Sequence, residues 1–202
     1  NTMFDDLREI QDQLSKVTDL LLEAATGLQT QNKDDLWDDV SEEEIQNTTL
    51  GKFLNCSNKG DIQGDINIGG ITGSMSIESD IDPEEDINKV GTESFHFRYE
   101  TRAILQACDN EGTVASRKDG SGGIVGRMSL GYLLDCENYG DISSNSGDYV
   151  GGIAGSSDSV IRQCWAKCKV SGDSYIGGIS GYASEIYDCT ALVEIDSSGG
   201  YL

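Results

Sequence analysis

The chain has 202 residues, of which 36 are acidic and 14 are basic, so its formal net charge is −22 at pH 7. Nucleic acids and anionic lipid surfaces are bound by clustered Lys and Arg, and this charge balance argues against both kinds of partner. No run of 18 apolar residues occurs, so no stretch of the sequence is expected to insert into a membrane as a helix. Glycine occurs 25 times, about twice its average usage, which is typical of a turn-rich repeat fold.

Residues 1–28 carry a heptad pattern of apolar side chains. Two core positions alternate at spacings of 4 and 3, which is the 3.5-residue period of a left-handed coiled coil. The first position holds Leu7, Leu14, Leu21 and Leu28, and the second holds Met3, Ile10, Val17 and Ala24. The pattern predicts an amphipathic helix with two alternative roles. It could self-associate, with a leaning toward trimers or tetramers, or it could cap the first repeat of the domain that follows.

Residues 30–49 are strongly acidic and are expected to form a second, short helix. Its apolar face would consist of Leu36, Trp37, Val40 and Ile45. Ser41 followed by Glu44 fits a capping box at the start of such a helix. The sequence therefore predicts a helical region over residues 1–49, with Trp37 as a packing anchor or, alternatively, a binding residue.

A repeated motif organises the rest of the chain, residues 50–202. The core Gly-Gly-Ile-x-Gly occurs at residues 69–73, 122–126, 151–155 and 177–181. A second motif, Cys-x-Asn-x-Gly-x-(Ile or Val), keeps step with it, and its copies start at Cys56, Cys108, Cys136 and, in decayed form, Cys164 and Cys189. From the second copy onward these cysteines are 28, 28 and 25 residues apart. The period predicts a mainly β domain, a parallel β-solenoid (β-helix) of about five coils of 25–28 residues.

Stacked coils, roughly 4.8 Å apart, turn each repeated position into a column. The expected columns are the five motif cysteines, the isoleucines Ile71, Ile124, Ile153 and Ile179, and an amide ladder of Asn58, Asn110 and Asn138. The repeat glycines are expected where the chain needs positive φ or passes close to a neighbouring coil. Disulfides between coils would fit the spacing, but recurrence at one position favours a column of reduced, buried thiols.

These motifs resemble the GLUG repeat family, whose short repeats carry a Gly-Gly-(Ile/Val)-x-Gly core. The resemblance covers about residues 50–202. GLUG repeats occur in large bacterial surface proteins, including adhesin-like proteins and some immunoglobulin A peptidases, so the resemblance implies an extracellular module at the bacterial cell surface. It implies no activity, because the repeat is an accessory part of those proteins, and the His-Glu-x-x-His of a zinc peptidase is missing from the sequence. The final Tyr201-Leu202 matches the residues before two of the cores, so the chain is expected to be a fragment that stops in mid-repeat.

An insertion interrupts the repeats at about residues 78–101. The interval from Ile71 to Cys108 is 37 residues, whereas other copies take 10 to 12. Insertions in repeat proteins map to loops on one face, often the binding face. The candidate contact residues for a host extracellular protein or glycan are Phe95, Phe97, Arg98 and Tyr99. Their alternation suggests a strand with an aromatic face, and packing of that face on the repeats is the alternative.

The insertion also contains an acidic turn. Hard cations such as calcium take oxygen ligands, and the candidate ligands are Asp80, Asp82, Glu84 and Asp86. The turn lacks the spacing and the glycine of an EF-hand loop. A protein without a cofactor is therefore the main prediction, and a calcium site is the alternative.

Catalytic motifs are scarce in this sequence. The single histidine, His96, has no nucleophile elbow and no orienting partner near it, which argues against a catalytic triad. Asp61 and Asp141 share a repeat position, as the carboxylates of a polysaccharide hydrolase or lyase would. Other copies have Thr113, Lys169 or Glu194 there, which is typical of a solvated column. The sequence predicts a non-enzymatic, adhesin-like surface module, with a structural stalk and a polysaccharide-active enzyme as alternatives.

Overall fold

The computed structural model describes residues 13–18, 37–77 and 99–199. They belong to two compact units, with residues 13–18, 37–38 and 99 in the first and residues 39–77 and 100–199 in the second. In the first unit residues 13–18 are helical, and the Thr18 hydroxyl donates to the Leu14 carbonyl at 2.8 Å. The rest of the heptad pattern lies outside the described residues, so the coiled coil and the cap both stay predictions. Within the parts described, no helix has the length and hydropathy needed to span a bilayer.

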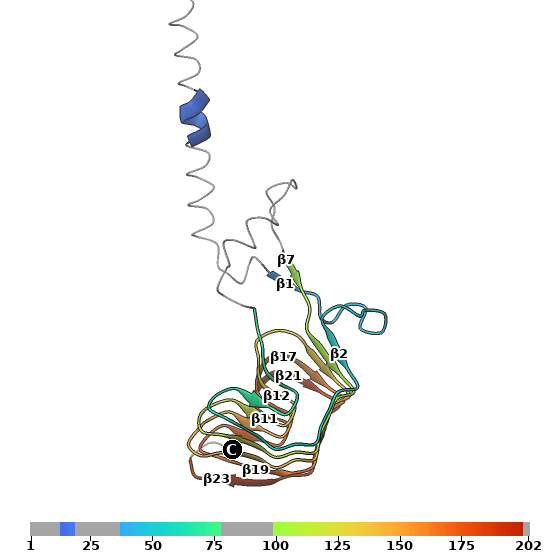
Figure 1. Ribbon diagram of the computed structural model, residues 1–202, viewed down its shortest axis with the longest axis vertical. Helices are drawn as coiled ribbons and strands as arrows, with labels where there is room; N and C mark the ends of the chain where they lie inside the picture. Colours follow the sequence, from blue (N-terminus) through green and yellow to red (C-terminus); the bar gives the residue numbers. More distant parts are fainter. Residues whose placement is uncertain (1–12, 19–36, 78–98, 200–202) are drawn as a thin grey trace, which may run out of the picture. The chain divides into compact units, whose positions relative to one another are not determined.

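The second unit is mainly β and consists of parallel sheets, through which the chain passes repeatedly (Figure 1). One sheet contains β3 (Ser57–Asn58), β9 (Asp109–Asn110), β14 (Glu137–Asn138), β18 (Trp165–Ala166) and β22 (Thr190–Ala191). The next contains β4 (Ile62–Gly64), β10 (Val114–Ser116), β15 (Ile142–Ser144), β19 (Lys169–Gly172) and β23 (Glu194–Ser197). A third contains β5 (Ile68–Gly69), β11 (Ser121–Gly122), β16 (Val150–Gly151) and β20 (Ile176–Gly177). The largest contains β2 (Lys52–Leu54), β6 (Thr72–Met75), β8 (Ile104–Gln106), β12 (Val125–Met128), β13 (Tyr132–Leu134), β17 (Ala154–Arg162) and β21 (Ser180–Tyr187).

We call each circuit through these sheets a passage, and the five passages cover residues 52–75, 104–128, 132–157, 160–183 and 185–197. Neighbouring passages are in register, so that Val114 of β10 lies opposite Ile62 of β4 and Ile142 of β15. The predicted isoleucine column is confirmed, because Ile124 donates its N–H to the Ile153 carbonyl at 2.8 Å and accepts from the Ile71 N–H at 3.0 Å. Both Ile124 and Ile153 are fully buried in the main core.

The predicted amide ladder is also confirmed. Asn58 Nδ2 donates to Asn110 Oδ1, and Asn110 Nδ2 donates to Asn138 Oδ1, both at 2.7 Å. Each of these amides also donates to the carbonyl two residues further on, at Gly60, Gly112 and Gly140. Asn110 and Asn138 are fully buried, so the ladder satisfies polar groups that would otherwise be unpaired in the core.

The cysteines form the third predicted column. The N–H of Glu137 bonds to the Cys108 carbonyl, and that of Trp165 bonds to the Cys136 carbonyl, both at 2.9 Å, which sets these cysteines in register. All six thiols are free. Each thiol of the column points to the carbonyl two residues before it, as Cys136 Sγ does to Leu134 at 3.4 Å. The three central cysteines, Cys108, Cys136 and Cys164, are buried, whereas Cys56 and Cys189 at the two ends of the column are partly exposed.

Of the two roles expected for the repeat glycines, close approach is the one that the Gly-Gly pairs serve. A Cβ on Gly123 would lie 2.2 Å from Asn138 Cγ and 2.3 Å from the Gly152 carbonyl oxygen. A Cβ on Gly70 would lie 2.5 Å from Asn110 Cγ. The second glycine of the pair thus makes room for the asparagine of the next passage. This contact explains why the two motifs recur with the same period.

Positive φ is found mainly at residues other than glycine. One set directly precedes the five motif cysteines and consists of Asn55, Ala107, Asp135, Gln163 and Asp188. A second set directly precedes the third sheet and includes Asn67, Tyr149 and Tyr175, with Gly120 as its glycine member. Each of the first four passages therefore has two left-handed corners, and the described part of the fifth has one, at Asp188. The motif glycines supply none of these corners.

The short helix predicted near residues 36–45 is wrong. Residues 37–39 form strand β1 (Trp37–Asp39), which pairs with β7 (Tyr99–Thr101), and residues 41–47 form turns. Ser41 does not cap a helix, because its hydroxyl bonds to Asp39 and accepts the N–H of Ala103 at 2.9 Å. The hydrogen bond from Ala103, which lies 62 residues further along the chain, therefore overrides the local capping pattern.

Candidate functional site

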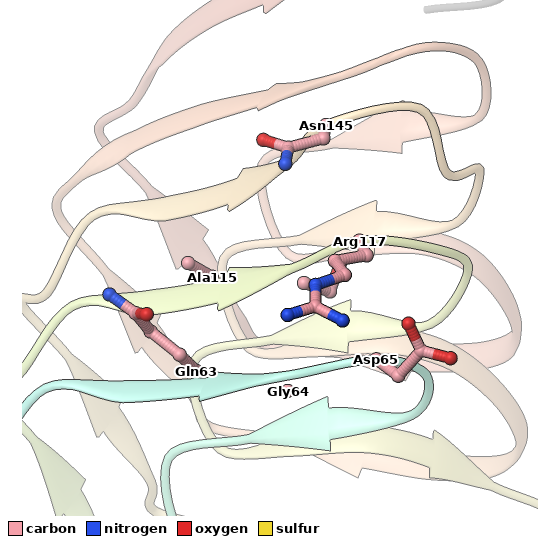
Figure 2. Close-up of a pocket in the computed structure, with 7 residues that line it drawn as sticks. Gln63, Gly64, Asp65, Ala115, Arg117 and Asn145 are labelled. Atoms are coloured by element: carbon pink, nitrogen blue, oxygen red, sulfur yellow. The ribbon is translucent and has the colours of Figure 1, made fainter.

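A polar depression lies on the outer face of the sheet that contains β4, β10 and β15 (Figure 2). Alternate residues of these strands point inward, and Val114 and Ile142 are buried in a core cluster. The register places Ala115 of β10 opposite Gln63 of β4 on the other face. The depression has a volume of about 550 Å³ and is lined by Gln63, Gly64, Asp65, Ala115, Ser116, Arg117 and Asn145.

Arg117 directly follows β10 and contributes the charged side chain over the depression. Its backbone is fixed on both sides, because its N–H donates to the Gly64 carbonyl at 3.2 Å and its carbonyl accepts from Ser146 Oγ at 3.1 Å. In Figure 2 the guanidinium group points toward β4 and lies between the side chains of Gln63 and Asp65. Among the described residues no hydrogen bond or ion pair of this guanidinium is found.

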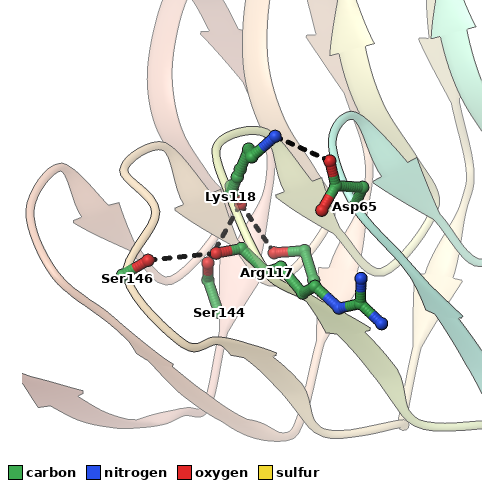
Figure 3. A network of polar contacts seen from close by, with 6 residues as sticks. Asp65, Arg117, Lys118, Ser144 and Ser146 are labelled. Atoms are coloured by element: carbon green, nitrogen blue, oxygen red, sulfur yellow. Dashed lines mark hydrogen bonds and ion pairs between the residues drawn. The ribbon is translucent and has the colours of Figure 1, made fainter.

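Lys118 points the other way and pairs with Asp65 (Figure 3). Its Nζ lies 2.7 Å from Asp65 Oδ2, and its backbone N–H donates to the Asp65 carbonyl at 2.8 Å. The hydroxyls of Ser116 and Ser144 donate to the Lys118 carbonyl at 2.7 and 3.0 Å. The hydrogen bond from Lys118 lowers the pKa of Asp65, with a smaller contribution from the charge of Arg117. Asp65 is therefore ionised and already paired at neutral pH.

Two further carboxylates near this corner act as backbone caps. Asp119 Oδ1 accepts the N–H of Asp148 at 2.9 Å, and Asp148 Oδ1 accepts the N–H of Ser174 at 3.1 Å. Each of these acids bridges its passage to the next. Their negative charges are thus partly satisfied by fixed amide dipoles.

The residues of the depression suit binding better than acid–base catalysis. A general acid or base works best with a pKa near the operating pH, whereas the pKa of Asp65 is lowered and a guanidinium does not deprotonate in proteins. Gln63 and Asn145 are exposed amides, each with donors and an acceptor. The set can hold a polar, anionic ligand but offers no proton-transfer pair.

The predicted site residues fall largely outside the described part of the chain. Phe95, Phe97 and Arg98 lie there, as do the carboxylates proposed for calcium, Asp80, Asp82, Glu84 and Asp86. Tyr99 lies in β7. Over residues 13–18, 37–77 and 99–199, no group of three or more His, Cys, Asp or Glu side chains is placed to hold a metal ion.

The carboxylates considered for an enzyme do share a column position but are used structurally. Asp61 Oδ1 accepts from the N–H and the hydroxyl of Thr113, at 3.0 and 2.8 Å, and these bonds lower the pKa of Asp61. Asp141 Oδ1 accepts the N–H of Lys169 at 2.8 Å. Each carboxylate thus bonds to the backbone of the next passage. The two are therefore not arranged as a catalytic pair.

The sequence predictions did not include the depression. One signal could have pointed to it, since Arg117 and Lys118 are the only two adjacent basic residues in this acidic chain. The amides Gln63 and Asn145 gave no signal, because only the register brings them to the same place.

No protein-family model, no curated protein and no solved structure matches the chain.

Proposed function

We propose that residues 50–202 form a parallel β-solenoid of GLUG-like repeats, and that the chain is a non-enzymatic binding or display module at a bacterial cell surface. One observation carries the proposal: the amide ladder of Asn58, Asn110 and Asn138 is continuous across three passages. Such a ladder requires the same side chain at the same place in successive passages, which is how a solenoid is built.

This construction separates a constant interior from a variable exterior. The inward column through Val114, Ile142 and Val170 is apolar in successive passages, whereas the outward column beside it holds Gln63, Ala115, Ser143 and Ser171. Neighbouring strands are roughly 4.8 Å apart, so the exterior presents different side chains at fixed, close spacing. A rigid surface of this kind can recognise an extended polymer or simply hold other segments away from the cell.

Two alternatives remain distinct from this proposal. A structural stalk uses the same rigid interior and predicts that no outward residue matters for binding. A polysaccharide-active enzyme requires paired catalytic carboxylates, and the backbone bonds of Asp61 and Asp141 speak against those two.

The proposal is tested by binding the intact chain to an array of glycans and extracellular-matrix proteins. We expect at least one specific signal, which a double substitution in the insertion, F95A/F97A, or a substitution in the depression, R117A, abolishes. The control is R127A, which removes an exposed arginine from a different sheet. Silence of the intact chain across the array would favour the stalk. New reducing ends or unsaturated products from a bound glycan would overturn the non-enzymatic assignment.

A further inference from the structure

We infer that the depression beneath Arg117 binds a carboxylate-bearing sugar, such as a uronic acid residue within an acidic glycan. The inference rests on the proposed binding role and names its ligand class. It follows from four properties of the described residues: an uncommitted guanidinium, a fixed backbone, occupied competing carboxylates and flanking amides.

The first property is the uncommitted charge of Arg117. Four other cations of the described residues have a carboxylate within 4 Å, namely Lys59 with Glu111, Lys118 with Asp65, Arg162 with Asp188 and Lys169 with Glu194. The exposed Arg127 has no such carboxylate among the described residues either, but it does not line the depression. Arg117 has none among the residues described, although the chain carries a net charge of −22. A guanidinium presents two parallel N–H donors that match the two oxygens of a carboxylate. The exposed fork of Arg117 is therefore available to a ligand.

The second property is the fixed backbone beneath this side chain. Gly64 of the previous passage and Ser146 of the next hold the Arg117 backbone at 3.2 and 3.1 Å. The two serine hydroxyls on the Lys118 carbonyl hold the following residue in the same way. The backbone beneath Arg117 needs no ordering on binding, which reduces the entropic cost of recognition.

The third property is that the nearest competing acid is occupied. Asp65 lies beside the guanidinium in Figure 2, yet its carboxylate pairs with Lys118 at 2.7 Å. Asp119 and Asp148 accept backbone N–H groups. One cation is thus left for the ligand, which suits a group of single negative charge better than a phosphate dianion.

The fourth property is the surface around the guanidinium. Gln63 and Asn145 flank it, and each amide can donate to one sugar hydroxyl and accept from another. Between them Ala115 and Gly64 have too little side chain to obstruct a ring. The volume of about 550 Å³ lies within the range of small-ligand sites. A sugar ring with one carboxylate matches this combination of charge, amides and space.

The experiment is an NMR titration of the intact chain with trigalacturonic acid, compared with its fully methyl-esterified form. We expect shifts of the backbone amides of Gln63, Arg117 and Asn145 with the acid, and at least tenfold weaker binding of the ester. R117A should bind the acid at least tenfold more weakly than the parent chain. The affinity of R117K should lie between those of R117A and the parent, because lysine keeps the charge but lacks the two parallel N–H donors. R127A should bind like the parent chain.

Several outcomes would overturn the inference. They are equal binding of acid and ester, unchanged binding by R117A, or no shift at these amides at about 10 mM ligand, where even a Kd of 1 mM would be nearly saturated. A sulfated oligosaccharide without carboxylates that binds as tightly as the acid would overturn the choice of a carboxylate. A far-UV circular dichroism spectrum and melting curve for each variant separate loss of binding from loss of folding. If the acid fails while the array gives a signal elsewhere, the proposed binding role stands without this site.

Discussion

The corner that follows the motif cysteine is filled in two different ways along the chain. In the first three passages it holds Asn58, Asn110 and Asn138, whose amides bond to one another. In the last two passages the same column position holds Ala166 and Ala191, as the strand register shows. Buried Asn138 and buried Ala166 are therefore direct neighbours with opposite polarity.

The change teaches how an amide ladder can end inside a protein. An asparagine in the middle of the ladder bonds to an asparagine on each side, and a buried amide without such neighbours has fewer partners for its donors and acceptor. Beyond Asn138 the chain changes to alanine, which has nothing to satisfy. Cys168 stands where earlier passages have Gly140 and its equivalents, and its side chain meets the Asn138 amide. Burial raises the pKa of Cys168 to about 11 against the opposing effect of this hydrogen bond, so its thiol stays neutral at the ladder's end.

Breaking the ladder at its centre should have the largest effect. N110A removes the partner of Asn58 Nδ2, of Asn138 Oδ1 and of the Gly112 carbonyl. Asn58 Nδ2 and Asn138 Oδ1 keep their bonds to Gly60 and Gly140, whereas the Gly112 carbonyl loses its side-chain donor. We expect the free energy of unfolding to fall by about 4 kcal/mol, since three hydrogen bonds of about 1 kcal/mol each are lost and a buried group is left without its donor. Urea denaturation measures the loss. N58A, at the more exposed end, is the control and should cost about 1 kcal/mol, the net value of one ordinary hydrogen bond. Equal losses would mean that position in the ladder is irrelevant.

The glycine that faces the ladder gives the next largest effect. G123A places a Cβ 2.2 Å from Asn138 Cγ and 2.3 Å from the Gly152 carbonyl oxygen, neither of which can easily move. We expect a loss of about 3 kcal/mol in urea denaturation, at the upper end for overpacked sites. G178A meets only side chains, at 2.8 Å from Ala191 Cβ and 3.2 Å from Val193 Cγ2, and should lose about 1 kcal/mol. The same loss for both would contradict a specific fit between glycine and asparagine.

Extending the ladder by one step sharpens the same comparison. A166N alone introduces an amide beside the Cys168 side chain, where the first three passages have a glycine, and should destabilise the protein by about 2 kcal/mol. A166N/C168G restores the whole motif, and its new amide can accept from Asn138. We expect the double variant to be about 1 kcal/mol more stable than the parent chain, as one added hydrogen bond would provide. If the double variant is no more stable than A166N, residues other than Ala166 and Cys168 also prevent the ladder from continuing.

The columns could be predicted from the sequence because identical residues recur at one period, and stacking such residues fixes the register. The left-handed corners could not, because Tyr149 and Tyr175 have no local preference for positive φ and adopt it where passages bond to each other. The capping pattern at Ser41 failed for the same physical reason, since a distant N–H competes for its hydroxyl. The depression joins residues of different types from three passages, and no periodic pattern marks such a set.

The smallest effect concerns the cysteine column, which also differs between its centre and its last passage. Cys136 is fully buried and its pKa is raised, whereas Cys189 is partly exposed. The pKa of Cys189 is lowered to about 7 by hydrogen bonds from Cys164, first from its side chain and also from its N–H, which lies 3.3 Å from Cys189 Sγ. The thiolate is the reactive form, so alkylation of Cys189 should rise through pH 7 and level off above about pH 8.

Iodoacetamide labelling of the native chain, followed by peptide mass spectrometry across this pH range, measures these rates. Cys189 should label roughly fivefold faster at pH 7 than at pH 6, while Cys136 stays unlabelled. C164A is the informative variant, because removing the Cys164 side chain takes away the first cause of the lowered pKa and should move the Cys189 midpoint upward. A Cys189 midpoint near the ordinary thiol value in the parent chain would contradict this account. It would mean that the Cys164 thiol and N–H do not stabilise the Cys189 thiolate, and that the last cysteine of the column is no more acidic than an ordinary thiol.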